Sequence, residues 1–473
     1  MRITSFKTLA LAAFLSLASS KPAEDLIKDG KLPGFNDTLP SDTYSGYLNV
    51  SDSKALHYMF AESIENPQDD PVLIWFNGGP GCSSLLGFFQ ENGPVVVDGD
   101  GNSLNPFPWN QKANVLYLES PAGVGFTLSN NGTDLIYNDM LQSEDAYKAL
   151  SQWYAKFPEF VDNKLWISGE SYGGIYVPYL AWQVYQHNMM AQWNANITKY
   201  NLEGFLVGNG ATNWDYDVSP SFPGTVGGFN LIPKTMWDEF DANNCTYYFN
   251  DFRAPSNPSK ECNDTWDKMQ TLTADLNWYD LYQPAGTPLL AHERVGKAIV
   301  DGRERTYKRG HTMAEYTPWL KHLFPEHSKF HTAVMGDPLT DYLNMNDTRD
   351  ALHISPAVES WSDCNDVINE KWNYQNEGSF WIYPIMKANG IKMRFYSGDT
   401  DGAVPTFGTK RWIRDLNWPV VEDWKPWLKS DGQVAGFIEQ YEGLDFVTVK
   451  GVGHMAPQYA REAVQTMVTS FIH

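Results

Sequence analysis

The sequence is poor in positive charge. It contains 35 Lys and Arg residues against 57 Asp and Glu residues, so its formal net charge at pH 7 is -22. A surface with this excess of carboxylates repels phosphate backbones and anionic lipid headgroups, which argues against nucleic acid and anionic membranes as partners. The same excess is consistent with a protein that stays soluble and works in an acidic compartment.

Long hydrophobic runs are absent except at the N-terminus. Residues 1–20 begin with the basic Arg2 and Lys7, continue with an apolar run and end in small residues near Ser20. This order predicts a secretory signal peptide. No later segment is apolar for long enough to span a bilayer, and the C-terminal sequence MVTSFIH contains no retrieval or lipid-anchor signal. We therefore expect a secreted or vacuolar protein.

Cysteine is scarce, and the few cysteines fit an oxidising compartment. The sequence contains four of them, Cys82, Cys245, Cys262 and Cys364. Secretion favours two disulfides, but spacing alone leaves three connectivities open. The chain also contains seven acceptor sequons for N-glycosylation, which start at Asn36, Asn49, Asn131, Asn196, Asn244, Asn263 and Asn346. Behind a signal peptide, these sequons predict a glycoprotein.

Internal repeats and low-complexity tracts are also absent. Residues 44–60 alternate and turn like a β-hairpin, and helical patterns occupy 143–157 and 456–472. Short apolar runs that end in glycine-rich or polar turns occupy residues 71–79, 114–120, 164–170, 202–210, 392–399 and 445–451. This alternation predicts an α/β protein with a mostly parallel central sheet flanked by helices.

Residues 212–345 interrupt that rhythm. They are rich in Trp, Tyr, Asn and Pro and contain two of the cysteines. We expect an insertion that covers one end of the sheet, within a single catalytic domain that spans residues 21–473. An independent domain is the alternative, but no linker-like stretch flanks the segment.

The segment KLWISGESYGGIY contains a candidate nucleophile. Gly169-Glu170-Ser171-Tyr172-Gly173 has the glycine-x-serine-x-glycine pattern of a nucleophile elbow, which lies between a strand and a helix. A serine hydroxyl becomes a good nucleophile only when a base removes its proton. We therefore expect an acid and a histidine to follow Ser171 in the chain, in that order.

Two later loops offer these partners. The strand-like KMRFYS is followed by Asp399 and Asp401, and the strand-like DFVTVK by His454. Both loops leave the carboxyl ends of predicted strands, where the sites of α/β proteins form. The oxyanion of a tetrahedral intermediate would take one N–H donor from Tyr172 and one from the glycine-rich loop at Gly78 or Gly79.

Several motifs together resemble the serine carboxypeptidase family, in particular its fungal, carboxypeptidase Y-like type. They are NGGPGCSS, ESPAGVGF, GESYGG, GNG, SGDTD and GHMAPQ, and the resemblance extends from about Tyr44 to the C-terminus. It implies an α/β-hydrolase fold with a largely helical cap. It also implies that Asp401 is the triad acid and that Gly79 and Tyr172 are the oxyanion donors. The disulfides implied by the family are Cys82–Cys364 and Cys245–Cys262.

The resemblance also gives a role to Glu170, the anion beside the nucleophile. An exopeptidase must recognise a terminal carboxylate, and the positions that match this role in the family are Trp75, Asn77, Gly78, Glu91 and Glu170. Two adjacent carboxyl groups share a proton because both cannot ionise cheaply, and a protonated carboxyl can donate to the substrate carboxylate. The matching pocket for the departing residue contains Leu86, Gln90 and Met455, so we expect hydrophobic leaving residues.

The sequence therefore predicts a serine-type carboxypeptidase that releases C-terminal amino acids at acidic pH through an acyl-enzyme. Its expected partners are the C-termini of peptides and proteins, its expected state is a monomer or homodimer, and we expect no metal and no cofactor. An acyltransferase on the same fold, a lipase or esterase, and a catalytically silent binding protein are the alternatives. The dinucleotide-like GVGHMA and the metal-like segment 322–331 are interpreted as coincidences, because too few residues follow the first and a proline interrupts the second.

Overall fold

The computed structural model describes residues 21–98, 101–129, 135–245, 258–283, 297–300, 303–306 and 337–473. The predicted signal peptide, the sequon at Asn131 and the metal-like segment 322–331 lie outside these residues. None of the described helices combines the length and the apolar character that crossing a membrane would require.

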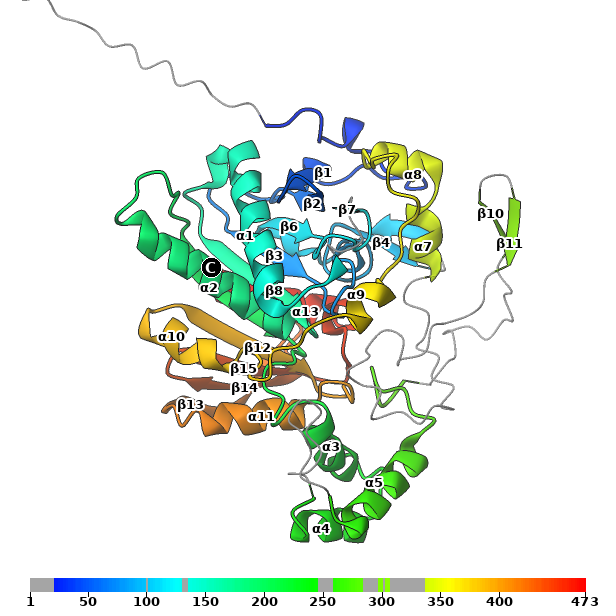
Figure 1. The fold of residues 1–473 in the computed structure, drawn as a ribbon, viewed down its shortest axis with the longest axis vertical. Coiled ribbons are helices and arrows are strands. Elements are labelled where there is room, and N and C mark those ends of the chain that lie inside the picture. Colours follow the sequence, from blue (N-terminus) through cyan, green and yellow to red (C-terminus); the bar gives the residue numbers. More distant parts are fainter. Residues whose placement is uncertain are drawn as a thin grey trace, which may run out of the picture.

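The molecule is built around one large mixed sheet (Figure 1). Its strand order is β1-β2-β6-β3-β8-β9-β12-β15-β14-β13, and β7 pairs with β2. The strands are β1 (Thr43–Asn49), β2 (Lys54–Ala61), β3 (Val72–Phe76), β6 (Asn114–Leu118), β7 (Leu128–Ser129), β8 (Leu165–Glu170), β9 (Leu202–Gly208), β12 (Lys392–Gly398), β13 (Val420–Leu428), β14 (Val434–Tyr441) and β15 (Leu444–Val449). A separate antiparallel pair is formed by β4 (Val95–Asp98) and β5 (Gly101–Leu104).

The centre of the sheet is parallel, as the sequence predicts. The chain of parallel neighbours runs β6-β3-β8-β9-β12-β15, and these strands coincide with the apolar runs. Every residue of β3, β6 and β8 is buried, because helices cover both faces of a parallel sheet. The predicted hairpin at residues 44–60 is the antiparallel pair β1–β2.

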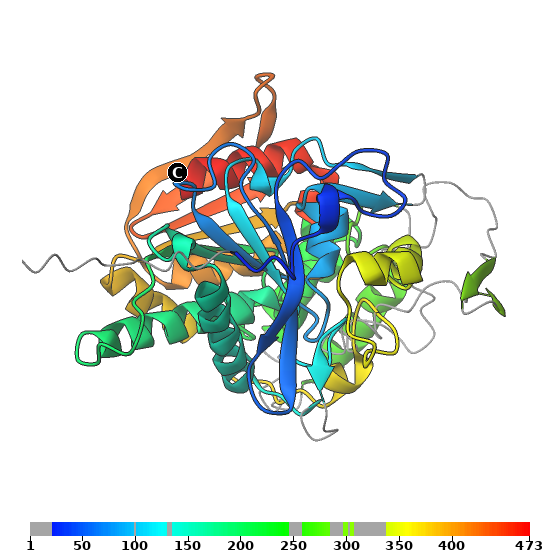
Figure 2. The same ribbon diagram turned by 90° about the horizontal axis from the view of Figure 1, so that it is seen from above.

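The sheet edge formed by β14 and β13, opposite the β1–β2 hairpin, was not predicted from the sequence. Strands β13 and β14 form an antiparallel hairpin that projects from the sheet in Figure 2. Most of β13 is exposed, and its sequence VVEDWKPWL mixes apolar and charged residues and is interrupted by Pro426. Because the strand has no buried face, its apolar residues do not alternate with polar ones in the regular period of two that predicts a strand.

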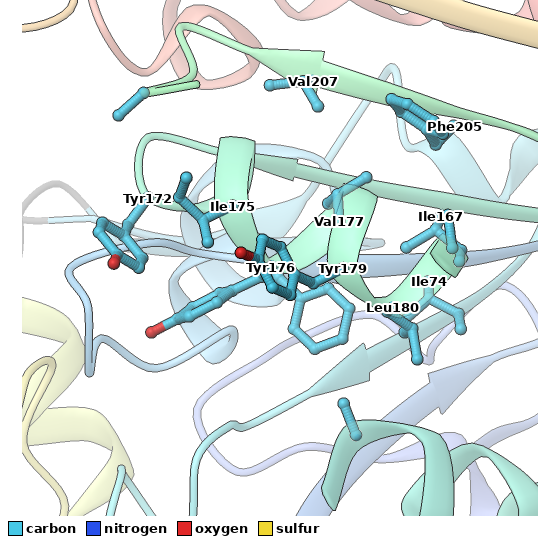
Figure 3. Close-up of a cluster of buried hydrophobic side chains, with 14 of the residues drawn as sticks. Ile74, Ile167, Tyr172, Ile175, Tyr176, Val177, Tyr179, Leu180, Phe205 and Val207 are labelled. Atoms are coloured by element: carbon cyan, nitrogen blue, oxygen red, sulfur yellow. The ribbon is translucent and has the colours of Figure 1, made fainter. Parts of the chain in front are cut away.

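Helices cover both faces of the sheet. On one face lie α1 (Asp139–Lys156) and α2 (Gly173–Ala191), and on the other lies α13 (Arg461–Ile472) (Figure 2). Ile74 packs in the core cluster on the α1 and α2 side, whereas its neighbours Leu73 and Trp75 pack in the cluster on the α13 side. This alternation is the two-residue period of a strand buried on both faces. Figure 3 shows Ile74, Ile167, Val177 and Leu180 gathered between α2 and the sheet.

The predicted helix at 143–157 begins earlier than expected, at Asp139, because the Asn138 side chain caps it by accepting a hydrogen bond from the Leu141 N–H. The predicted last helix is split at Ala460 into α12 (Ala456–Tyr459) and α13. The remaining elements of the main body are η1 (Lys28–Gly30), η2 (Gly87–Glu91), η3 (Trp109–Gln111), η5 (Pro158–Phe160) and α11 (Thr406–Asp415).

A long crossover joins the neighbouring parallel strands β9 and β12. It contains η6 (Ser219–Ser221), α3 (Phe222–Gly228), α4 (Lys234–Ala242), α5 (Lys260–Thr273), β10 (Lys297–Val300), β11 (Arg303–Thr306), α7 (Asp337–Leu343), α8 (Asn346–Ala351), α9 (Asp366–Glu370), η9 (Phe380–Ile382) and α10 (Tyr383–Ala388). Figure 1 shows α3, α4 and α5 grouped below α11. The described part of this connection is largely helical, and its division from the catalytic domain at residues 212–345 remains a prediction.

Candidate active site

Ser171 occupies a sharp turn between β8 and α2. Its φ angle is +61°, in the left-handed region that residues other than glycine rarely adopt. Hydrogen bonds hold the turn: the Ser171 N–H donates to the Gly208 carbonyl at 3.1 Å, and the Ser171 carbonyl accepts from the Ala211 N–H at 3.0 Å. A Cβ on Gly169 would lie 2.6 Å from the Phe76 carbonyl oxygen, so the neighbouring strand approaches too closely for any side chain there. The strained backbone presents the serine at the end of the strand.

Asp401 and His454 are in contact. The Oδ2 atom of Asp401 lies 2.8 Å from Nδ1 of His454, and both side chains are buried. Asp401 also accepts hydrogen bonds from Asn209 Nδ2 at 2.8 Å and from the Ala403 N–H at 2.7 Å. Asp399, the other candidate, instead accepts from the Gly451 N–H at 2.7 Å. The structure therefore brings Asp401, not Asp399, to the histidine.

The second ring nitrogen of the histidine points to a role as a base. His454 Nε2 is buried and has no hydrogen-bond partner among the described residues. Ser171, Asp401 and His454 follow β8, β12 and β15, and the carboxyl ends of these parallel strands lie at one edge of the sheet. Such an edge can carry a serine, a base and an acid that orients the base.

The glycine loop after β3 packs against the elbow. A Cβ on Gly78 would lie 2.3 Å from the Tyr172 backbone nitrogen and 2.8 Å from Ser171 Cβ. A side chain at Gly78 would therefore fill the space in front of the Tyr172 N–H, one of the two predicted oxyanion donors. The other donor, Gly79, follows directly with φ +111°. Tyr172 precedes the first residue of α2, so its N–H lies at the positive end of the helix dipole.

The predicted carboxylate-binding residues form one hydrogen-bonded chain. Trp75 Nε1–H donates to Asn77 Oδ1 at 2.8 Å, and Gly87 N–H donates to the same oxygen at 2.9 Å. Asn77 Nδ2 donates to Glu91 Oε1 at 2.7 Å and to Glu170 Oε1 at 3.1 Å. Both glutamates are buried. Both the oxygen and the nitrogen of the Asn77 amide are fully hydrogen-bonded, and the amide fixes the two carboxyl groups side by side next to Ser171.

The electrostatics of this pair favour a retained proton. Burial raises the pKa of both Glu91 and Glu170, and the charge of Glu91 raises the pKa of Glu170 further. The positive charge of Arg461 lowers the pKa of Glu91. The negative charge of Asp401 raises the pKa of Glu170. The Oε2 atoms of both glutamates lack a donor among the described residues. One proton, held on Glu170, would reduce the repulsion between them.

The predicted carboxylate-binding residues Trp75, Asn77, Gly78, Glu91 and Glu170 make up the predicted carboxylate clamp. The three residues predicted for the leaving-residue pocket are buried near this clamp. Leu86 immediately precedes η2, Gln90 lies in η2 next to Glu91, and Met455 precedes α12, which packs against η2. Sequence reasoning missed Arg461, which donates from Nη1 to the Glu91 carbonyl at 2.6 Å and from Nη2 to the Gln90 carbonyl at 2.8 Å. A single arginine on an amphipathic helix looks like a solvent-facing residue, so no local signal could have identified it.

Both disulfides suggested by the family resemblance are present. Cys82–Cys364 joins the glycine loop to the long crossover, and Cys245–Cys262 lies within that crossover. The sequon asparagines that the structure describes are all exposed, namely Asn36, Asn49, Asn196, Asn244, Asn263 and Asn346. Their glycosylation remains a prediction that this exposure permits.

Comparisons with known proteins show what the chain as a whole is similar to. Residues 33–473 match the family model described as serine carboxypeptidase. The chain is 35% identical to the lysosomal protective protein of Mus musculus, over 99% of its own length and 98% of that protein. It is 34% identical to serine carboxypeptidase-like 20 of Arabidopsis thaliana, over 98% of its own length and 96% of that protein. These relatives come from a mammal and a plant, and the fungal type stays a prediction.

A solved structure confirms the predicted α/β-hydrolase fold. The prohormone-processing carboxypeptidase Kex1(delta)p from Saccharomyces cerevisiae superposes with a TM-score of 0.73. The two sequences are 20% identical, and the superposition covers 95% of each chain. At this identity the likeness concerns the fold.

Proposed function

The chain belongs to the serine carboxypeptidase family, and we propose that Ser171, His454 and Asp401 carry out its reaction, the release of C-terminal residues from peptides. The observation that carries this proposal is the chain Trp75–Asn77–Glu91/Glu170, which lies directly beside the nucleophile. A general esterase has no need for two buried carboxyl groups at this place. An enzyme that must hold a terminal carboxylate has that need.

The first half of the reaction forms an acyl-enzyme. His454 Nε2 accepts the proton of the Ser171 hydroxyl, and the serine oxygen attacks the last peptide carbonyl. Asp401 orients the imidazole through Nδ1 and stabilises its protonated form. The backbone N–H groups of Gly79 and Tyr172 stabilise the oxyanion. His454 then gives its proton to the departing amine, and the terminal amino acid leaves.

The second half hydrolyses the acyl-enzyme. Water takes the place of the amine, His454 accepts its proton, and the peptide acid leaves from Ser171. The chain's own residues suffice for both halves, so the proposal includes no metal and no cofactor. Transfer of the acyl group to an alcohol would use the same residues, and it becomes the alternative if water proves a poor acceptor.

The clamp selects the chain end. Neutral Glu170 donates a hydrogen bond to the substrate carboxylate, the Asn77 amide holds both glutamates in place, and the Gly78 backbone completes the site. Because the buried pair holds its proton more tightly than isolated glutamates do, the clamp is competent at acidic pH. Loss of that proton would place a second negative charge against the substrate carboxylate, which weakens binding.

The proposal also covers the processing, cellular location, oligomeric state and domain organisation of the enzyme. Removal of the signal peptide 1–20 and glycosylation would yield a secreted or vacuolar enzyme that acts on peptide and protein C-termini. We expect a monomer or a homodimer, which light scattering after size-exclusion chromatography measures. The catalytic domain would span residues 21–473 with the cap insertion at 212–345.

One pair of substrates tests the function. An N-blocked dipeptide with a free C-terminal carboxyl and its C-terminal amide are compared at about pH 4.5, near the ordinary pKa of a glutamate. Release of the last residue from the free acid alone, abolished in Ser171→Ala, supports both the carboxypeptidase and the clamp. Equal cleavage of both substrates would leave a serine hydrolase without the clamp. Cleavage of neither, with acyl transfer to an added alcohol, would favour the acyltransferase.

A further inference from the structure

Residues 277–282, which follow α5 in the predicted insertion, dock on both catalytic loops. The His454 N–H donates to the Tyr279 carbonyl at 2.7 Å, and the Gly402 N–H donates to the Trp278 carbonyl at 2.8 Å. In the other direction, the Leu281 N–H donates to the Thr400 carbonyl at 2.9 Å. The insertion therefore bonds to the backbones on either side of the Asp401–His454 pair.

Residues 277–282 approach the loops that contain Asp401 and His454 so closely that Gly402 and Gly453 have no room for a side chain. A Cβ on Gly453 would lie 1.9 Å from the Tyr279 carbonyl oxygen, and a Cβ on Gly402 would lie 2.6 Å from an atom of the Trp278 ring. The Tyr279 and His454 rings meet edge to face, with centroids 4.8 Å apart. Both glycines are thus required by the docking of residues 277–282, and the imidazole is supported by an aromatic ring from that segment.

Asp280 is the polar centre of this contact. Its carboxyl accepts a hydrogen bond from Thr400 Oγ1–H at 2.7 Å, and Asp280 packs so closely on Gly453 that a Cβ there would lie 2.6 Å from Asp280 Cβ. The Tyr282 N–H donates to it at 3.1 Å and closes the local turn. Thr400 immediately precedes Asp401, and Gly453 immediately precedes His454. One buried residue therefore accepts a hydrogen bond from the residue directly before the acid and packs against the residue directly before the base.

We propose that Asp280 is a positioning residue that sets the distance and orientation between Asp401 and His454. The proposal rests on the roles given above to those two residues. Proton transfer in the triad depends on geometry at the scale of an ångström, so a residue that ties both loops together affects the rate of chemistry. No hydrogen bond among the described residues joins Asp280 to the clamp residues, which lie on β3, the loop directly after it, η2 and β8.

This arrangement predicts a specific kinetic signature. Asp280→Ala removes the acceptor of the Thr400 hydroxyl and the carboxyl that fills the space between the two loops, and we expect kcat to fall by about tenfold or more while KM for the free-acid dipeptide stays unchanged. Asp280→Asn keeps an acceptor oxygen and should restore most of kcat. Thr400→Val removes one hydrogen bond from the other side, with little change in shape, and should lower kcat by a smaller factor. The losses in Asp280→Ala and Thr400→Val should not be additive in the double variant.

The experiment counts active sites, because a smaller fraction of folded enzyme would lower the apparent kcat in the same way as slower catalysis. Ser171 is titrated with a serine-directed phosphonate, and kcat is expressed per titrated site, with Asp275→Ala as the control. Asp275 is an exposed acidic residue in the same connection and should leave kcat unchanged. If Asp280→Ala does not fold, Thr400→Val and Asp280→Asn provide the comparison.

The outcomes are distinguishable. A lower kcat per titrated site with unchanged KM and rescue by Asn supports the proposal. Fewer titratable sites or a lower melting temperature with a normal kcat per site would overturn it and leave only a structural role. In that case normal wild-type turnover and labelling would leave the proposed function intact. A wild type that neither hydrolyses the dipeptide nor reacts at Ser171 would contradict both.

Discussion

Glu91 and Glu170 accept hydrogen bonds from a single nitrogen, Nδ2 of Asn77, at 2.7 and 3.1 Å. This arrangement holds two buried carboxyl groups together that would repel each other if both were ionised. The Asn77 amide donates to Oε1 of each glutamate. One proton shared between the two Oε2 atoms would remove the repulsion between the carboxyl groups. In the proposed function, protonation of this pair couples substrate binding to pH.

The first prediction concerns the pH dependence of KM. Burial and mutual repulsion raise the pKa of the pair, so the binding-competent protonated form is present at low pH and is lost as pH rises through that pKa. We expect KM for the free-acid dipeptide to rise between about pH 4 and pH 8, measured by initial rates. In Glu170→Gln, which stays neutral and can still donate, the rise should be much smaller. A wild-type KM that is constant over this range would contradict the shared proton.

The second prediction separates the two aspartates of the acid loop. Asp401→Asn should lower kcat by about four orders of magnitude, as loss of a triad aspartate does elsewhere, because the imidazole loses the group that orients its tautomer. Asp399→Asn is the matched control, because Asp399 bonds to Gly451 rather than to His454. Its kcat should stay within a few-fold of the wild type. Equal losses in both variants would remove the special role of Asp401.

The third prediction concerns the preference for the departing residue. The predicted pocket contains no charged side chain among Leu86, Gln90 and Met455, so we expect kcat/KM to be at least about tenfold higher for release of Leu or Phe than of Arg. Gln90→Glu places a carboxylate in the pocket and should narrow this ratio through faster release of Arg. The ratio of kcat/KM values is measured from the release rates of a series of N-blocked dipeptides that differ in the last residue. An unchanged ratio in Gln90→Glu would place Gln90 outside the pocket.

The fourth prediction concerns stability away from the catalytic residues. Buried Glu119 accepts hydrogen bonds from the Phe126 N–H at 3.0 Å and Trp361 Nε1–H at 3.1 Å, and it lies 2.8 Å from His57 Nδ1. Ser83 Oγ–H donates to it as well. Glu119→Ala leaves these groups without their acceptor and should lower the free energy of unfolding by about 3–5 kcal/mol.

Urea denaturation with the disulfides intact measures this loss. The control is Glu144→Ala, an exposed glutamate on α1, which should change the free energy of unfolding by less than about 0.5 kcal/mol. Equal stability of the two variants would mean that the donors around Glu119 find other partners.

Much of the fold could be predicted because its signals are local. The strands β3, β6 and β8 are apolar along their whole length, as two-sided burial requires, and glycine at position 169 follows from the closeness of β3. Strand β13 was missed for the converse reason: it is exposed, so its apolar residues show no regular alternation with polar ones. The order of Ser171, an acid and His454 after three parallel strands was also visible, since parallel strands align their carboxyl ends.

The sequence by itself determined where the buried central strands form, where the chain turns sharply and which side chains can do the chemistry, because each of these depends on neighbours in the chain. Only the tertiary structure decided which distant polar groups meet. The residue pattern left Asp399 and Asp401 open and the family resemblance implied Asp401, whereas the contact of Asp401 with His454, the contact of Arg461 with η2 and the position of Asp280 against both loops depend on chain closure over long separations. A hydrogen bond between distant residues leaves no period and no local motif, since either partner alone looks like an ordinary polar residue.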